Sequence, residues 1–275
     1  MRFTHKIALL LCLLTIVTVN SQEKLKGNKD VITQNRDVSD FNRIEVIDDI
    51  DVYLTYNDVQ SVKVETDSNL QDAVLTQVSN GLLSIKLNDK IVRSKELAVH
   101  IHVNKQLKEI NSYNKSKITS KTSLAIDTLT VNTFDNSNIS LKLSSQIVHI
   151  NSNKSSDLNL EISSKSIIVN ALESSDITGN FASTEAFFRL LDKASMEIEG
   201  SASNFEIETL GNTSFKGKDF KADAILVNAT NDSKTYINAK KNIDIRAKNS
   251  AEVYLYSNPK ITLTEFFDKA SIYKK

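Results

Sequence analysis

A small residue recurs about every 19 positions through the C-terminal two-thirds of this chain. We call these residues the anchors. They are Ser116, Ser137, Ser156, Ser175, Ala194, Thr213, Ser233, Ala251 and Ala270, with spacings of 21, 19, 19, 19, 19, 20, 18 and 19. Apolar residues stand six positions before each of the first eight anchors and, apart from Thr235, two positions after every anchor. A fixed period near 20 residues indicates a solenoid, in which each unit buries its apolar face against its neighbours.

Each repeat has the pattern of two short strands around a polar turn, clearest in residues 129–137, 148–156 and 167–175. β-Branched residues are common at the apolar positions and no apolar period of 3.6 is sustained, which argues against helices. Leucine-rich repeats have a similar length but need regularly spaced leucines and a helix. The sequence therefore predicts an all-β fold, a right-handed parallel β-helix (β-solenoid) with coils of about 19 residues that stack about 4.8 Å apart.

The residue two positions before each anchor is suited to a tight turn. These turn residues are Asn114, Asp135, Lys154, Glu173, Asp192, Gly211, Asn231, Asn249 and Asp268. Asn and Asp tolerate the left-handed backbone region better than other side chains, and Gly adopts it freely. On the strand before the turn, Asn132, Asn151 and Asn170 share one coil position, so we expect their side-chain amides to form a ladder.

The N-terminal third is rich in strand patterns but less regular. Alternation begins at Phe41, and Asn80-Gly81 separates two apolar runs, which is a strong signal for a type I′ hairpin. Terminal units of solenoids are expected to be atypical because one face lacks a neighbour. We predict a flexible lead over residues 22–38 and one β-helix domain over residues 39–275, with irregular coils over 39–106 and regular repeats over 107–275.

Residues 1–21 have the features of a secretory signal peptide: Arg2 and Lys6, an apolar run over residues 7–19, and small or apolar residues before a cleavage point. The run of about 13 residues is shorter than the roughly 20 that a membrane span needs, which disfavours the alternative of an anchor. Cys12 is followed by more apolar residues, which disfavours a lipid-attachment site. We expect an exported protein located in the periplasm, on the outer-membrane surface or outside the cell.

Cleavage would remove the only cysteine, and disulfide, thiol and zinc-thiolate chemistry with it. It would also remove two basic residues and no acid, which leaves 32 basic against 34 acidic residues, a net charge of −2. No basic stripe is visible, so nucleic acid is not an expected partner.

Several segments resemble one known family. They are the corner pattern of small and polar residues between short apolar strands, the opening segments 41–46, 50–54 and 81–85, and the closing segment 243–261. Over about residues 40–273 the chain resembles the putative auto-transporter adhesin family, head GIN domain, in which the corners usually carry glycines. The resemblance implies a bacterial envelope protein with a β-helix fold.

The strand over residues 99–103 carries two histidines on one face, His100 and His102. A metal site there would need a third ligand, so we interpret them as residues of a solvated strand face, and likewise His149. An acidic cluster at Asp48, Asp49 and Asp51 lacks the glycine and the distant Glu of an EF-hand. We interpret it as a charged turn rather than a calcium site.

Four acidic residues, Asp135, Glu173, Asp192 and Asp268, fall at the turn position. Only Glu173 and Asp192 belong to adjacent coils, at about the carboxylate separation of a retaining glycosidase. No apolar groove is visible beside them that would raise one pKa. A polysaccharide lyase would need Lys or Arg beside calcium, and the arginines are scattered. We expect no catalytic pair.

Two aromatic pairs, Phe187-Phe188 and Phe266-Phe267, interrupt the strand pattern. We interpret each as a bulged corner with both rings partly buried. The alternative is that one ring of each pair faces out and serves as a platform for a glycan or a protein partner.

We expect a secreted, non-catalytic envelope or surface protein that is adhesin-like or ligand-binding, with no catalytic, cofactor or metal site. Two alternatives stay open: a polysaccharide-active β-helix enzyme, and a structural module that pairs through its solenoid end. The expected partners are a glycan or a protein at the cell surface. The last coil is followed by Lys274 and Lys275, and we expect its edge to be charge-protected in a monomer or paired in an end-to-end dimer.

Overall fold

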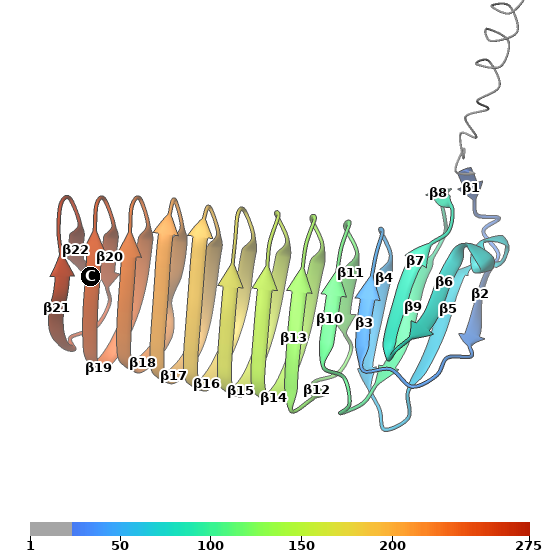
Figure 1. Ribbon diagram of the computed structural model, residues 1–275, viewed down its shortest axis with the longest axis horizontal. Coiled ribbons are helices and arrows are strands. Elements are labelled where there is room, and N and C mark those ends of the chain that lie inside the picture. Colours follow the sequence, from blue (N-terminus) through green and yellow to red (C-terminus); the bar gives the residue numbers. More distant parts are fainter. Residues whose placement is uncertain (1–23) are drawn as a thin grey trace, which may run out of the picture.

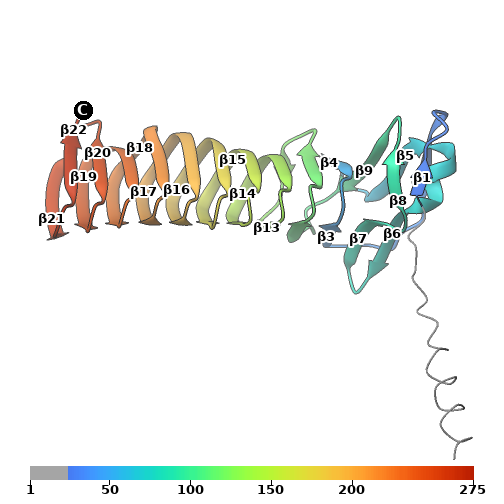
Figure 2. The ribbon, with the colours of Figure 1, turned by 90° about the horizontal axis from the view of Figure 1, so that it is seen from above.

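The computed structural model describes residues 24–275, which form a rod of stacked coils with a cluster of strands at its N-terminal end (Figures 1 and 2). The predicted signal peptide and Cys12 lie outside the described residues. Within the described part of the chain, no helix is long and apolar enough to cross a membrane.

The N-terminal elements are β1 (Lys24–Lys26), β2 (Val31–Arg36), β3 (Arg43–Val46), β4 (Asp51–Tyr56), β5 (Ser61–Asp67), the 3₁₀ helix η1 (Ser68–Ala73), β6 (Val74–Ser79), β7 (Leu82–Leu87), β8 (Lys90–Arg93) and β9 (Leu97–Val103). The repeats comprise β10 (Glu109–Ser112), β11 (Lys117–Ser120), β12 (Leu124–Ala125), β13 (Thr128–Thr133), β14 (Asn138–Ser152), β15 (Asp157–Ala171), β16 (Asp176–Asp192), β17 (Ser195–Gly211), β18 (Ser214–Thr230), β19 (Lys234–Lys248), β20 (Glu252–Leu255), β21 (Lys260–Phe266) and β22 (Ser271–Lys274).

Each coil is a flattened loop of two strand segments joined by the anchor turn. We call the outer surface of the segments that precede the turns the pre-turn face, and that of the segments that follow them the post-turn face. Val148 pairs with Ile167 on the pre-turn side and Leu158 with Ile177 on the post-turn side, all in parallel register. All four side chains are buried. The predicted parallel β-solenoid with a 19-residue repeat is therefore confirmed.

The anchor turns follow the sequence prediction closely. The first eight anchors are buried, and the last, Ala270, is partly buried. All nine turn residues have a positive φ, between 51° at Lys154 and 95° at Gly211. A small anchor is needed because its side chain points into the narrow end of the coil, where hydroxyl groups also meet: Ser137 Oγ lies 3.4 Å from Ser156 Oγ.

The two repeats that depart from 19 residues contain β-bulges. The strand register shifts between Glu197 and Glu199 where β17 meets β18, and again between Ala222 and Ala224 where β18 meets β19. A bulge adds a residue to one strand without moving the rest of the ladder. The spacings of 20 and 18 residues are thus absorbed within the post-turn segments and leave the anchors in line.

A coil that the repeat pattern missed lies at the N-terminal end. β3 and β4 pair in parallel with β10 and β11. Ile50, buried between them, holds the anchor position, and Asp48 before it has φ 77°. The next strands outward, β7 and β9, pair with β3 and β4 but come later in the chain. Because stacking order and chain order differ here, no fixed spacing marks these coils.

Antiparallel strands close the stack at this end. β6 pairs with β7 through the predicted Asn80-Gly81 hairpin, in which both residues have a positive φ. β5 pairs antiparallel with β9, and β2 with β5. The flexible lead expected over residues 22–38 thus contains two strands, β1 and β2. The polar composition of β2 suits an outermost strand, which buries few of its side chains.

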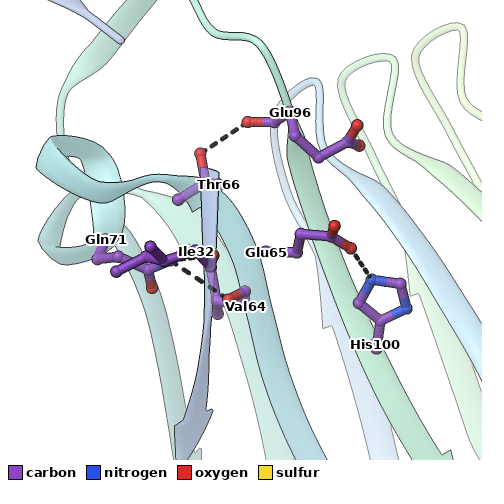
Figure 3. A network of polar contacts seen from close by, with 7 residues as sticks. All are labelled: Ile32, Val64, Glu65, Thr66, Gln71, Glu96 and His100. Carbon is purple, nitrogen blue, oxygen red and sulfur yellow. Dashed lines mark hydrogen bonds and ion pairs between the residues drawn. The ribbon is translucent and has the colours of Figure 1, made fainter. Parts of the chain in front are cut away.

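Buried polar side chains hold the terminal strands together (Figure 3). Gln71 in η1 is 3% exposed, and its amide donates to the carbonyls of Ile32, 3.0 Å away, and Val64, 3.3 Å away. Thr66 donates to the Glu96 carbonyl at 2.7 Å. Because unpaired polar groups are costly in the interior, these bonds fix the position of η1 over the strands.

The buried carboxylate of Asp67 fixes two further loops. It accepts hydrogen bonds from the backbone amides of Lys29 and Lys95. Burial acts to raise the pKa of Asp67, but these bonds and one from Glu96 outweigh it, so the pKa is lowered.

The C-terminal end is different. β21 and β22 pair only inward, with β19 and β20. Ile261 and Leu263 occupy core positions but are 47% and 51% exposed, whereas their equivalents one coil earlier, Ile243 and Ile245, are 1% and 0% exposed. Within residues 24–275, no strand covers this edge.

Candidate functional site

A polar ladder runs along the pre-turn face. Asn132 donates to Asn111 at 2.8 Å, Asn151 to Asn132 at 2.8 Å, and Asn170 to Asn151 at 3.0 Å. The predicted amide ladder is confirmed and has one more member, Asn111. From the next coil on, charged residues take the position, beginning with Arg189, whose Nε lies 3.0 Å from a Glu208 oxygen. The character of the face therefore changes along the rod.

A groove of about 340 Å³ lies on the charged half of the pre-turn face. Five successive coils line it. The outward side chains at its surface are Glu185, Phe187, Asn204, Glu206, Ala224, Leu226, Asn242, Asp244 and Thr262. Ala224 leaves the hollow because it is the small member of its column, between Asn204 and Asn242.

The groove combines an apolar patch with acceptor groups. Phe187 is 42% exposed, and Leu226 is half-buried beside it in the same column of outward side chains. Three carboxylates lie around the patch. Glu185 accepts from Asn204 at 2.8 Å and Asp244 from Thr264 at 2.6 Å. Among the residues that line the groove, none is basic.

An aromatic core supports the groove from below. Phe188 and Phe205 point inward from the pre-turn segments and contact three rings of the post-turn segments, Phe181, Phe215 and Phe220, with centroids 5.0 to 6.3 Å apart. Gly217 makes room for this cluster, since a Cβ there would lie 2.4 Å from the Phe215 ring. Close packing of large rings makes the floor of the groove rigid.

The prediction for Phe187-Phe188 was wrong. The pair lies in regular strand, with Phe188 2% exposed and Phe187 outward, so the alternative of one exposed ring applies. Phe266 and Phe267 are 37% and 57% exposed. They lie at the uncovered C-terminal end, where the core has no further coil to bury them.

The family description "putative auto-transporter adhesin, head GIN domain" matches residues 40–259. The chain belongs to this family. The match spans the whole stack of coils from β3 to β20 and includes every residue of the groove except Thr262. No curated protein matches the chain.

Solved structures show the same fold as this GIN-domain chain. A putative adhesin from Parabacteroides merdae is 16% identical with a TM-score of 0.61, covering 92% of this chain and 99% of its own. A putative lipid binding protein from Parabacteroides distasonis is 18% identical with a TM-score of 0.59, covering 92% and 97%. A putative adhesin from the same organism is 15% identical with a TM-score of 0.57, covering 92% and 100%.

A second, larger groove of about 640 Å³ lies on the post-turn face. It is polar, and its charged groups are already paired: Lys216 with Glu197 at 2.9 Å, and Glu161 with Lys142 at 2.7 Å. A ligand there would have to displace these contacts. The hollow over Phe187 is therefore the better binding site of this GIN-domain chain.

The predicted acidic residues do not gather into a site. Glu173 and Asp192 stand on adjacent turns with their side chains exposed, outside both grooves. The sequence reasoning missed another carboxyl, Asp176, which pairs in register with Asp157 of the preceding coil. Partial burial, and then the charge of Asp157, raise the pKa of Asp176.

The histidines have structural contacts. His100 Nε2 lies 2.8 Å from a Glu65 oxygen (Figure 3), and its ring stacks on Tyr53. His102 lies on the same face of β9. Asp48 accepts from the Leu87 amide at 3.0 Å. Within residues 24–275, no group of three or more side chains is placed to hold a metal ion.

Proposed function

We propose that this protein is an exported, adhesin-like surface protein that binds neutral oligosaccharides, without transforming them, in the groove over Phe187. The observation that carries the proposal is the exposed Phe187 ring set among carboxylates on a rigid, concave face. Export is supported by the features of residues 1–21, and adhesion by membership of the adhesin family.

The chemistry of the groove selects the ligand class. An apolar patch beside a few placed polar groups is typical of small-ligand sites. Ionised carboxylates accept hydrogen bonds but donate none, so the ligand must bring donors. A sugar ring offers both an apolar C–H face for Phe187 and hydroxyl donors for Glu206 and Asp244. Acidic glycans are disfavoured, because the lining carries three carboxylates and no basic residue.

A glycan array with the purified protein tests the proposal, with neutral and acidic oligosaccharides side by side. We expect binding to neutral glycans that falls tenfold or more, about 1.4 kcal/mol, in Phe187→Ala and also falls in Glu206→Gln. Phe267→Ala removes an exposed ring outside the groove and is the matched control. Equal binding by Phe187→Ala and the control, or binding only to acidic glycans, would contradict the proposal.

The non-catalytic part is tested separately. The Glu173→Gln/Asp192→Asn double variant and the Asp176→Asn variant cover the carboxyls that an enzyme would use. We expect no cleavage of bacterial or plant polysaccharides by the wild-type protein. Hydrolysis or lyase activity that disappears in either variant would show that the protein is an enzyme.

A further inference from the structure

The C-terminal end of the rod presents an unpaired strand edge with apolar side chains. β21 is exposed along its whole length, and Ile261 and Leu263 are half-exposed although they occupy core columns. An edge of this kind is a template for pairing with another strand. We propose that two copies of this chain pair tail to tail through β21, in an antiparallel arrangement about a two-fold axis at Thr262.

The free backbone groups define this register. Thr262 occupies the same strand position as Thr130, whose N–H bonds back to the Lys108 carbonyl of the preceding coil at 2.9 Å. In a parallel ladder, adjacent residues direct their N–H and C=O groups to opposite sides. The groups of Ile261 and Leu263 therefore face the open edge.

A two-fold axis at Thr262 sets Ile261 opposite Leu263 of the second copy. These two residues then exchange both backbone hydrogen bonds, as a narrow antiparallel pair does. Their side chains stay on the core side, so that the apolar interior continues from one rod into the other.

The outward side chains are also self-complementary. The same register brings Lys260 beside the second copy's Glu265, and the two-fold axis repeats that contact. Lys274 and Lys275 do not block the edge. Lys274 Nζ bonds to the Ser257 carbonyl at 2.5 Å, and Lys275 Nζ lies 5.2 Å from the centre of the Tyr254 ring, so both ammonium groups turn back onto the body of the rod.

The opposite end excludes a head-to-tail arrangement. There β2, β5 and β6 already cover the coils with antiparallel strands, so β21 would meet a closed surface. Because like ends pair, the assembly stops at two copies and does not grow into a filament.

An introduced disulfide tests the register. In a Cys12→Ser background, Thr262→Cys provides a single cysteine that faces its own copy across the axis, in a non-hydrogen-bonded pair where Cβ atoms are closest. Thr130→Cys, at the same strand position in an interior coil, is the matched control. We expect mild oxidation to link Thr262→Cys into a covalent dimer and to leave the control unlinked.

Sedimentation tests the association itself. We expect the mass of the wild-type protein to double with rising concentration and Leu263→Lys to stay monomeric. A charge at this exposed position should not unfold the chain, which circular dichroism verifies. A wild type that is monomeric at every concentration, species larger than a dimer, or linkage of Thr262→Cys no faster than of Thr130→Cys would overturn the proposal.

Discussion

The two ends of the rod solve the same problem differently. At the N-terminal end the chain reverses direction, so β5 and β2 lie antiparallel over β9, and polar side chains such as Gln71 lock them in place. At the C-terminal end the last coil stops with β21 uncovered. Coil repetition alone buries every apolar column except the last, so an end needs either a change of strand direction or a partner.

The largest effect should come from the anchors. Ser175 is buried at the narrow end of a middle coil, so Ser175→Trp should lose about 3 kcal/mol or more through overpacking. Ala270→Trp makes a similar change at the last anchor, which has no coil beyond it, and should cost less than half as much. Lys165→Trp, at an exposed position of β15, should be nearly neutral. Urea unfolding of the three variants measures this, and equal losses for Ser175→Trp and Ala270→Trp would contradict the difference between middle and end.

The polar lock of the N-terminal end should have the next largest effect. Gln71→Leu leaves the carbonyls of Ile32 and Val64 and the Arg36 guanidinium without their partner, a loss of about 1–3 kcal/mol. Gln77→Leu, on the exposed side of β6, is the control and should change stability little. Unchanged stability of Gln71→Leu would mean that the network does not hold the end together.

Asp67 should make the N-terminal end sensitive to acid. Its folded-state pKa is lowered, so it stabilises the fold above its unfolded value of about 3.9 and loses that contribution as the pH falls through the lower folded pKa. Exchange of the Lys29 and Lys95 amides should accelerate on acidification relative to the pH trend of interior-coil amides such as Asn151. In Asp67→Asn this extra acceleration should disappear. If it persists in that variant, another group is responsible.

The smallest effect is expected from the terminal lysines. Replacement of Lys274 and Lys275 by Thr should change self-association little, because both side chains fold back rather than project across the edge. Sedimentation of wild type and variant measures this. A strong rise in association would show that the lysines protect the edge.

Sequence periodicity predicted the interior of the rod well. The anchors, the turn residues with a positive φ and the Asn ladder all follow from the 19-residue repeat, because each depends on contacts one coil away. The coil at Ile50 escaped the repeat because β5, β6 and β7 intervene before its outer neighbour. A reversal of stacking order leaves no trace in spacing.

The groove was only partly predictable. Strand alternation allows Phe187 to face out, but its setting depends on residues from four further coils and on Ala224, whose effect is an absence of volume. The raised pKa of Asp176 likewise depends on Asp157 one coil away. Sequence motifs carry no such signal, since no two of these residues are close in the chain.

Amide hydrogen exchange, followed along the chain at several protein concentrations, tests the central claim most directly. The account predicts that β5 and the β2 amides bonded to it are protected at every concentration. The Ile261 and Leu263 amides should exchange quickly in dilute protein and slow as the concentration rises. If β2 and β5 exchange as fast as β21 does in dilute protein, the N-terminal end is not closed and the contrast between the two ends is wrong.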